Sequence, residues 1–304
     1  MENNNFLIVI VGPTAVGKTA LSVELARQLD CEILSADSRQ FYMEMNIGTA
    51  KPTEAEMAGV CHHFVDFLPV EQTMSAGQFE EMAIEKLDEI FQNQHISILT
   101  GGSGLYINAV LNGMSEMPSP PNEIRDALMK ELETIGLDEL LKELKDCDHD
   151  YYEKVDKKNH QRVVRALEMI RYTGKPFSSF RMGKKAERNF QTIKIGLEIP
   201  RDELHERINK RVDRMIEVGL LSEVKRLFAK RELNALQTVG YKEIFDFLDD
   251  KYDWEEAIRL LKRNTRRFAK RQMTWFKKDE ETKWFHPTQL NEMHEYIIKN
   301  MNQS

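Results

Sequence analysis

The sequence has few cysteines and no long hydrophobic run, and each shortage argues against a class of protein. Its three cysteines are widely spaced and include no C-x-x-C pair, which argues against a disulfide framework and against a cysteine-based zinc site. The longest early apolar run, Phe6 to Val11, is too short to cross a bilayer and has neither the basic flank nor the cleavage site of a secretory signal. We therefore expect a cytoplasmic protein that does not contact a membrane.

Glycine and proline are also scarce, with 15 and 9 residues, so the chain is neither collagen-like nor of low complexity. A hydrophobic fraction of 41% beside 31% charged residues is typical of a folded protein with a substantial core. Since domains contain roughly 150 residues, a length of 304 predicts one unit with an insertion, or two lobes.

Acidic residues are scarce in two stretches, although the net charge is −7. Residues 154–188 contain eleven Lys or Arg and three acids, and residues 259–278 contain nine Lys or Arg and no acid. The rest of the chain therefore carries a net charge of −24. Because phosphate responds to the local field, both stretches are candidate surfaces for a polyanion. The alternative is that both are ordinary solvated helix faces.

Short apolar runs alternate with helical patterns near the start of the chain. The runs typical of buried strands are Phe6 to Val11, Glu32 to Ser35 and Ile96 to Leu99. Residues Ala20 to Leu29 recur with helical spacing, and Ser75 with Gln78 forms a capping box for a helix that runs to about Phe91. This alternation predicts an α/β fold, a parallel sheet flanked by helices.

A glycine-rich loop of the P-loop pattern G-x-x-x-x-G-K-[ST] lies between the first predicted strand and the first helix. Its residues are Gly12, Pro13, Thr14, Ala15, Val16, Gly17, Lys18 and Thr19. The glycines let backbone N–H groups converge on phosphate oxygens, Lys18 adds a full charge, and the Thr19 hydroxyl can ligate a metal ion. The loop predicts a site for two linked phosphates, of a nucleotide or of another diphosphate, with Mg²⁺ as cofactor.

The acid that organises water for hydrolysis beside most P-loops is poorly represented here. The strand from Ile96 to Thr100 ends in Gly101 and Gly102 instead. The best acid at a strand end is Asp37, which would project into the crevice at the carboxyl edge of the sheet. A helix cap or a metal-organising acid is the alternative interpretation of Asp37.

A change of pattern at Met117 to Pro121, where the sequence is M-P-S-P-P, indicates a domain boundary. The residues that follow are helical as far as Gly174, and a strand-like segment, Thr192 to Ile199, then returns. We predict that residues 1–117 and 191–304 form a P-loop α/β core with C-terminal basic helices. Residues 118–190 form a mainly helical insertion.

The remaining candidates for chemistry are two adjacent histidines and three tryptophans. His62 and His63 could be a metal pair, but neighbours in a strand point to opposite sides, which favours packing and surface roles. Trp254, Trp275 and Trp284 are interpreted as packing residues.

Six further blocks follow one another in an order that is found in a known family. They are Asp37 to Tyr42, Ile47 to Pro52, Gly101 to Tyr106, Gln161 to Glu168, Gly240 to Glu243 and Thr265 to Trp275. Together they span nearly the whole chain, and the sequence resembles the bacterial tRNA dimethylallyltransferases, the isopentenyl-transferase family. The resemblance implies transfer of a dimethylallyl group from its diphosphate to N6 of the adenosine at tRNA position 37, just 3′ of the anticodon.

The same resemblance implies roles for individual residues. It makes Lys18 and Thr19 the diphosphate and Mg²⁺ contacts, Asp37 the general base, and Ser103 a residue at the reacting centre. The family more often has Thr at the position of Ser103, and Ser keeps the hydroxyl without the methyl group that fixes its rotamer.

A further diphosphate contact is expected from Arg207 or Arg211, and the sequence does not decide between them. The resemblance and the basic stretches together imply a set of residues that contact tRNA. The set is Asp37, Ser38, Arg39, Gln40, Ser103, Arg125, Gln161, Arg162, Val163, Val164, Arg165, Lys270 and Arg271. The expected partners are therefore tRNA and dimethylallyl diphosphate, and we expect a monomer.

Three other functions compete with a Mg²⁺-dependent tRNA prenyltransferase. The loop alone would suit a kinase of small molecules. An adenylate isopentenyltransferase would use free AMP, for which neither the helical insertion nor the second basic stretch is needed. An RNA-binding switch driven by nucleotide hydrolysis would also combine a P-loop with basic surfaces, but the hydrolytic acid is hard to find.

Overall fold

The computed structural model describes residues 4–114, 118, 120–180 and 186–303, and the chain divides into two units. Unit 1 contains the described residues of Met1–Asn112 and Glu187–Ser304, and unit 2 those of Gly113–Ala186. Unit 2 corresponds to the insertion predicted at residues 118–190, and both of its bounds lie a few residues nearer the N-terminus.

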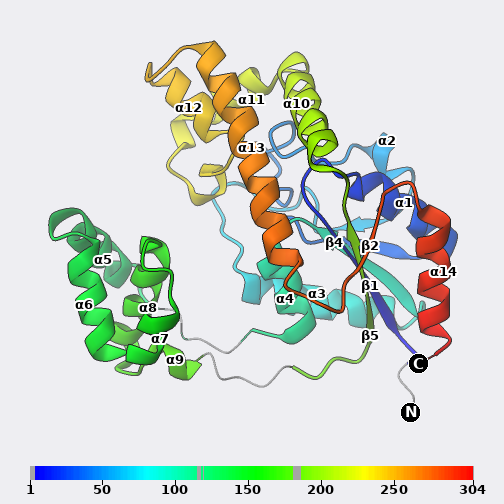
Figure 1. The fold of residues 1–304 in the computed structure, drawn as a ribbon, viewed down its shortest axis with the longest axis horizontal. Coiled ribbons are helices and arrows are strands. Elements are labelled where there is room, and N and C mark those ends of the chain that lie inside the picture. Colours follow the sequence, from blue (N-terminus) through cyan, green and yellow to red (C-terminus); the bar gives the residue numbers. More distant parts are fainter. Residues whose placement is uncertain (1–3, 115–117, 119, 181–185, 304) are drawn as a thin grey trace. The chain divides into compact units, whose positions relative to one another are not determined.

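Unit 1 contains a sheet of six parallel strands in the order β3-β2-β4-β1-β5-β6. The strands are β1 Phe6–Val11, β2 Glu32–Ser35, β3 His62–His63, β4 Ile96–Gly101, β5 Gln191–Leu197 and β6 Lys283–Phe285. All of β1 is buried, because helices cover both faces of the sheet (Figure 1). The predicted α/β fold with a parallel sheet is confirmed.

The inner strands follow the prediction more closely than the edges do. β1 and β2 have the predicted bounds, and β4 and β5 overlap the predicted segments. The edge strands β3 and β6 are not among the predicted elements, since two and three residues are too few to give a periodic signal.

Helices of unit 1 cover both faces of the sheet, and a hydrophobic cluster lies between the sheet and the helices on each face. The helices are α1 Lys18–Leu29, α2 Glu54–Met57, α3 Ala76–Ile90, α4 Gly104–Asn112, α10 Arg201–Glu217, α11 Leu220–Leu227, α12 Lys242–Leu248, α13 Trp254–Phe276 and α14 Leu290–Met301, with the 3-10 helices η1 Phe228–Lys230 and η2 Asn234–Leu236. Side chains of β1 alternate between the clusters, as a strand requires, so that Leu7 and Val9 pack toward α3 and α4 while Ile8 and Ile10 pack toward α1 and α14. In Figure 1 the long helix α13 runs beside α10, with which it packs.

The predicted capping box at the start of α3 is confirmed. The Ser75 hydroxyl accepts a hydrogen bond from the Gln78 backbone N–H at 3.2 Å, and the Gln78 side chain accepts one from the Ser75 N–H at 2.9 Å. The helix ends at Ile90, one residue before the predicted position.

Unit 2 contains only helices within its described residues. They are α5 Asn122–Thr134, α6 Leu137–Cys147, α7 His149–Lys154, α8 His160–Thr173 and α9 Phe177–Phe180. Leucine side chains of α5, α6 and α8 form a hydrophobic core within this unit. Several residues of the predicted boundary and of the first basic stretch lie outside the described residues: Met117, Ser119, Arg181, Lys184 and Lys185. Among the helices that the structure describes, none combines the length and the apolar character needed to cross a bilayer.

Candidate active site

A cavity of about 770 Å³ opens at the carboxyl ends of β2 and β4 and beside the loop that follows β1. This is the edge at which parallel α/β sheets bind their ligands. Helices α10 and α13 contribute further lining residues, and every lining residue belongs to unit 1. The predicted site residues that line the cavity are Thr14, Ala15, Gly17, Lys18, Thr19, Asp37, Ser38, Arg39, Gln40, Ser103, Arg211 and Arg271.

The glycine-rich loop folds around the side chain of Lys18. The Lys18 ammonium donates to the backbone carbonyls of Gly12 and Pro13, both at 2.9 Å. Gly17 precedes α1 with a φ of +110°, a conformation that favours glycine. Burial lowers the pKa of Lys18 to about 8, although the neighbouring carboxylate of Asp37 acts in the opposite direction. The charge of Lys18 is therefore lost in mildly alkaline solution.

The two candidate arginines on α10 occupy different places. The Arg211 guanidinium lines the cavity and donates to the Thr14 hydroxyl at 3.2 Å. Arg207 is not among the cavity-lining residues, donates to the Val16 carbonyl at 3.2 Å and pairs with Glu203 on its own helix. Of the two candidates on α10, Arg211 is thus the one that lines the cavity.

Asp37 lies just after β2, at the cavity. One of its carboxylate oxygens accepts a hydrogen bond from the Arg39 backbone N–H at 3.1 Å, which makes Asp37 the first residue of a local turn. No helix starts at this turn in the described chain, so Asp37 is not a helix cap. The carboxylate favours the charged forms of both Lys18 and Arg211, which puts it in the electrostatic field of the glycine-rich loop and α10.

Two serine hydroxyls join the ends of β2 and β4 beside Asp37. The Ser103 hydroxyl accepts from the Ser38 backbone N–H at 2.9 Å and contacts the Ser38 hydroxyl at 3.0 Å. Gly101 is required here, because a Cβ at this position would lie 2.2 Å from the carbonyl oxygen of Ala36. The glycine that ends β4, where a hydrolytic acid is usual, is therefore explained by the close approach of two strand ends.

Gln272 of α13 connects the glycine-rich loop to the segment after β4. Its side-chain oxygen accepts from the Thr14 N–H at 2.8 Å, and its amide nitrogen donates to the Gly102 carbonyl at 3.0 Å. The side chain is buried. Gln272 is not among the predicted site residues, and the feature of the sequence that distinguishes it is an amide directly after the cations Lys270 and Arg271.

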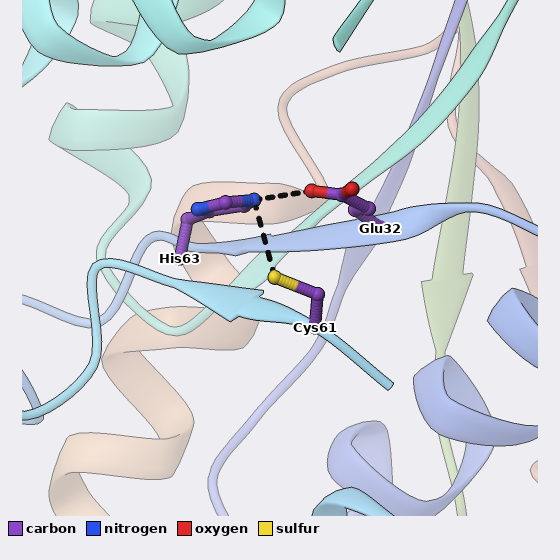
Figure 2. A group of neighbouring side chains, drawn as sticks. All are labelled: Glu32, Cys61 and His63. Atoms are coloured by element: carbon purple, nitrogen blue, oxygen red, sulfur yellow. Dashed lines mark hydrogen bonds and ion pairs between the residues drawn. The ribbon is translucent and has the colours of Figure 1, made fainter. Parts of the chain in front are cut away.

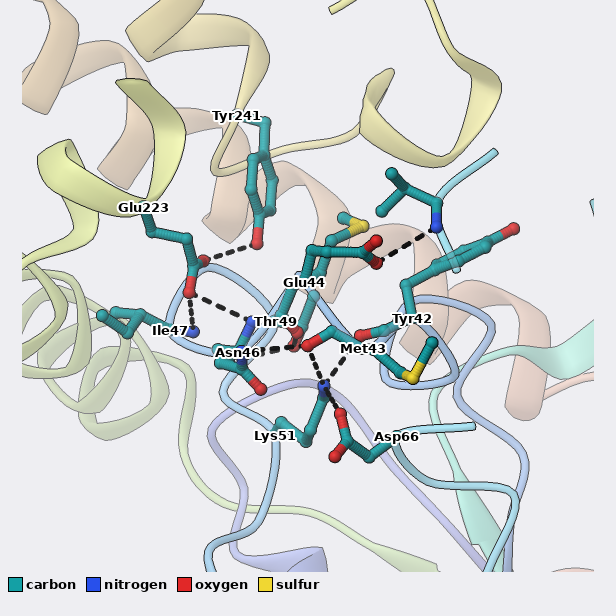
Figure 3. Close-up of polar contacts among 12 residues, drawn as sticks. Tyr42, Met43, Glu44, Asn46, Ile47, Thr49, Lys51, Asp66, Glu223 and Tyr241 are labelled. Atoms are coloured by element: carbon teal, nitrogen blue, oxygen red, sulfur yellow. Dashed lines mark hydrogen bonds and ion pairs between the residues drawn. The ribbon is translucent and has the colours of Figure 1, made fainter. Parts of the chain in front are cut away.

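The loop from Asn46 to Gly48 is held by a buried carboxylate. Glu223 of α11 accepts from the backbone N–H groups of Asn46 and Ile47 at 3.1 and 2.8 Å, and from the Tyr241 hydroxyl at 2.7 Å (Figure 3). It also accepts from the Gly48 N–H at 2.9 Å. Burial first, and Glu223 second, raise the pKa of Tyr241. Because every acceptor contact of Glu223 is to a distant segment, the sequence offers no local pattern that identifies it.

Arg39 and Gln40, which the sequence predicts as tRNA contacts, also bind backbone groups of unit 1. The Arg39 guanidinium donates to the carbonyls of Asn234 and Ala235 at 3.1 and 3.0 Å. The Gln40 amide donates to two carbonyls of the segment that follows Gly48. Both side chains therefore fix the shape of the cavity wall that they line.

The tryptophans divide between packing and the cavity. Trp254 and Trp284 pack against the hydrophobic cluster of unit 1, as predicted. Trp275 packs against the backbone of Gly104, but its side chain is also 42% exposed and lines the cavity, which the prediction of a packing residue did not include. Exposed Phe268 and Arg271 lie near it on α13, and Lys270 is on the exposed part of the same helix.

In unit 2, the predicted tRNA-contacting segment of α8 has two sides. Gln161 and Arg162 are exposed, whereas Val163 and Val164 are fully buried in the core of the unit. The predicted contact through the two valine side chains is therefore corrected: their apolar side chains pack inside and hold the helix.

Arg125 and Arg165 share one acidic partner, Glu168. The Glu168 side chain is 5% exposed, and its carboxylate lies 3.1 Å from Arg165 and 3.6 Å from Arg125. Both guanidinium groups remain accessible to solvent, with 40% and 45% of the side chain exposed. The buried acid thus fixes the two cations at the surface of unit 2.

The fold and the cavity define an α/β protein whose ligand site is built on a glycine-rich loop after the first strand. The chain belongs to the IPP transferase family, whose model matches residues 40–279.

Full-length relatives support this membership. The chain is 52% identical to the tRNA dimethylallyltransferase of Cytophaga hutchinsonii, over 97% of both chains. The solved tRNA isopentenylpyrophosphate transferase of Bacillus halodurans is 38% identical over 98% of this chain and 97% of its own, with a TM-score of 0.74. A eukaryotic dimethylallyltransferase acting on tRNA is 30% identical over 89% of this chain and 69% of its own, with a TM-score of 0.73.

Proposed function

We propose that this protein is a tRNA dimethylallyltransferase, which transfers the dimethylallyl group of dimethylallyl diphosphate to N6 of the adenosine at tRNA position 37. The observation that carries the proposal is the single cavity in which a phosphate-binding loop and the carboxylate of Asp37 meet, in a chain 52% identical to an enzyme of that name. The product is the N6-dimethylallyl adenosine, i6A37, and diphosphate is released.

The glycine-rich loop and Arg211 are suited to the diphosphate end of the donor. Loop N–H groups, the start of α1 and the ammonium of Lys18 all present positive charge at one side of the cavity. When the allylic C–O bond breaks, its electron pair goes to the diphosphate, so these donors stabilise charge where it accumulates. Gln272 holds the loop in place by bonding the Thr14 N–H.

The oxygen donors beside Lys18 fit a magnesium ion. The Thr19 hydroxyl and the Asp37 carboxylate both line the cavity, and hard oxygen ligands are those that Mg²⁺ prefers. When bound there, the ion would neutralise part of the diphosphate charge. Thr19 is the residue that we propose as its ligand, as in other loops of this pattern.

Asp37 is suited to remove the proton from the attacking amine. The lone pair of an adenine amine is delocalised into the ring, so the nitrogen gains nucleophilicity if its proton leaves while the N–C bond forms. Proton transfer of this kind contributes about 10²–10⁴-fold to the rate. The Arg39 N–H orients the carboxylate, and the linked hydroxyls of Ser38 and Ser103 fix the turn that carries it.

Recognition of tRNA is proposed for the exposed cations of both units. Lys270 and Arg271 lie on α13, and Arg162 and Arg165 lie on α8, accompanied by Gln161 and Arg125. Cations that neutralise phosphate position an RNA, while amides and stacked side chains read its unpaired bases. Extrusion of the target base costs a few kcal/mol, which such contacts offset.

The direct test is incubation of the protein with radiolabelled dimethylallyl diphosphate, Mg²⁺ and tRNA, followed by nucleoside analysis. We expect label in N6-dimethylallyl adenosine of the tRNA. Parallel reactions contain AMP in place of tRNA, or ATP with small-molecule acceptors. Label on free AMP alone would identify an adenylate isopentenyltransferase, and phosphate transfer from ATP without labelled tRNA would identify a kinase.

We also propose that the active form is a monomer. Sedimentation equilibrium of the active protein is the measurement. A stable dimer at assay concentration would contradict the proposal.

A further inference from the structure

A second group of potential ligand atoms lies at the β3 edge of the sheet and contributes nothing to the cavity. Glu32 begins β2, Cys61 precedes β3, and His63 ends β3. One ligand atom from each side chain lies within 4.8 Å of the other two, and this is the one such trio of metal-ligating side chains among the described residues. Figure 2 shows the three side chains converging on one point beside the two strands.

The pairing of the two strands explains why these three side chains meet. β2 and β3 are parallel with Ile33 opposite His62, and the Ile33 N–H donates to the Cys61 carbonyl at 3.0 Å. Since alternate residues of a strand point to the same face, Cys61 and His63 point to one face while His62 points to the other. His62 bonds the Val60 carbonyl instead, at 2.9 Å. The two histidines therefore point to opposite sides of β3, as the sequence predicts, and the expected packing or surface role is replaced for His63 by the proposal made below.

Nε2 of His63 contacts both other side chains of the trio, and the Cys61 thiol also hydrogen-bonds Glu32. Nε2 of His63 lies 2.5 Å from a carboxylate oxygen of Glu32 and 3.5 Å from the sulfur of Cys61. A neutral imidazole has one N–H in total, so this nitrogen can donate only one proton between two acceptors. A cation placed among the three atoms would satisfy the nitrogen, the sulfur and the oxygen together.

The chemistry of the donors selects the ion. One thiolate, one imidazole and one carboxylate form a ligand set that suits Zn²⁺ and excludes the hard ions Mg²⁺ and Ca²⁺. In a tetrahedral zinc site neighbouring ligand atoms are about 3.3–3.7 Å apart, as bond lengths of roughly 2.0–2.3 Å require. The Cys61 to His63 separation already fits this range, and the Glu32 to His63 contact needs to open by less than about 1 Å.

Charge around the trio also favours a cation. The Glu32 carboxylate puts a negative charge within the trio itself, 2.5 Å from Nε2 of His63, and a nearby cation is Lys86 of α3. Lys86 is paired with Glu89 on its own helix, which reduces the positive field that reaches the trio. A divalent ion would displace the thiol proton to solvent, so that one proton is released for each ion bound.

We propose that Glu32, Cys61 and His63 form a zinc site with three protein ligands and a water molecule as the fourth. The site joins β3, which has only two residues, to β2. Just after β3, the N–H groups of Asp66 and Phe67 bond the carbonyls of Gln40 and Phe41, so zinc would stabilise the segment next to the Asp37 turn. The proposal does not rest on the transferase activity.

The test uses the full chain in reduced form, with Co²⁺ as a spectroscopic probe and Zn²⁺ competed against a chromogenic chelator. We expect one ion per chain, a thiolate-to-cobalt charge-transfer band in the near ultraviolet, and a higher melting temperature with zinc. Cys61→Ser should remove the charge-transfer band, and His63→Gln should weaken zinc binding by at least about 100-fold.

Two matched variants control for adventitious binding. His62→Gln removes the neighbouring histidine on the other face, and Cys147→Ser removes the second exposed cysteine of the chain. Both should bind zinc like the unchanged protein. Circular dichroism and melting of each metal-free variant establish folding, and Glu32→Gln, which keeps the shape of the side chain, provides a further ligand test. Zinc binding that survives Cys61→Ser and His63→Gln, or a cobalt band that disappears in Cys147→Ser, would overturn the proposal.

Discussion

The cavity of unit 1 and helix α8 of unit 2 use polar residues in opposite ways. In the cavity, the side chain of Lys18 bonds carbonyls of its own loop, and those of Gln272 and Ser103 bond backbone groups from other parts of the fold, so all three are fixed before any ligand arrives. On α8, the guanidinium groups of Arg162 and Arg165 extend from a helix whose inner side is apolar, and Glu168 anchors only the second. A site fixed by internal hydrogen bonds suits bond making, and exposed cations suit the binding of a polyanion. Substitutions in the two regions should therefore alter different kinetic quantities.

The largest effect is expected from Asp37→Asn. Loss of the proton acceptor should lower kcat by about 10²–10⁴-fold, while the Kd for tRNA stays within about twofold. Single-turnover transfer and filter binding measure the two quantities. Asp30→Asn, at the exposed end of α1, is the matched control and should retain full activity. A rate near normal in Asp37→Asn would remove this residue from the mechanism.

Gln272→Ala should have the next largest effect. It removes hydrogen bonds to the glycine-rich loop and to Gly102, and each unsatisfied buried group costs about 1–3 kcal/mol. We expect kcat/KM for the prenyl donor to fall by about 10- to 100-fold with tRNA affinity unchanged. Thr274→Ala, two residues further along the same helix and exposed, is the control. Equal behaviour of the two variants would contradict a positioning role for Gln272.

Replacing Arg162 and Arg165 by Ala tests the other side of the comparison. Affinity for tRNA should fall about tenfold at low salt, and the slope of log Kd against log salt should decrease by roughly one for each cation removed. Single-turnover kcat at saturating tRNA should stay unchanged. Lys142→Ala, an exposed cation of α6 paired with Glu139, should leave the slope as it is. An unaltered slope in the double variant would place the RNA surface elsewhere.

The smallest effect is a pH dependence of donor binding. The pKa of Lys18 is lowered to about 8, so the ammonium is charged below that pH and becomes neutral as the pH rises through it. KM for dimethylallyl diphosphate should be constant below about pH 7.5 and about fourfold higher at pH 8.5. Lys18→Arg keeps its charge at these pH values and should flatten the profile. Steady-state KM measured from pH 6.5 to 9 distinguishes the two.

The sequence predicted the parts of this protein that depend on local patterns. The strand Phe6–Val11, the glycine-rich loop and the capping box of Ser75 each have a contiguous signal, and each is present. Glu223 was not predicted, because its partners are backbone groups of a distant segment. The exposure of Trp275 was not predicted either, because the sequence does not show which side of a long helix borders a cavity.

Val163 and Val164 show what is lost when all residues of a family's tRNA-contacting segment are assigned the same role. The segment from Gln161 to Arg165 lies on a helix, so its consecutive residues face different directions, and the two valines face the core. Periodicity applied to the segment would have separated the exposed arginines from the valines.

The close approach of β2 and β4 at Gly101 has a consequence for redesign. A Cβ there would lie 2.2 Å from a backbone oxygen, and one on Gly102 would lie 2.4 Å from the amide nitrogen of Gln272. Neither position can receive an aspartate or glutamate unless its surroundings move. An acid at Gly101, as in an enzyme that hydrolyses nucleoside triphosphates, would therefore require movement of the backbone, whereas an acid at Gly102 would displace the Gln272 side chain from the glycine-rich loop.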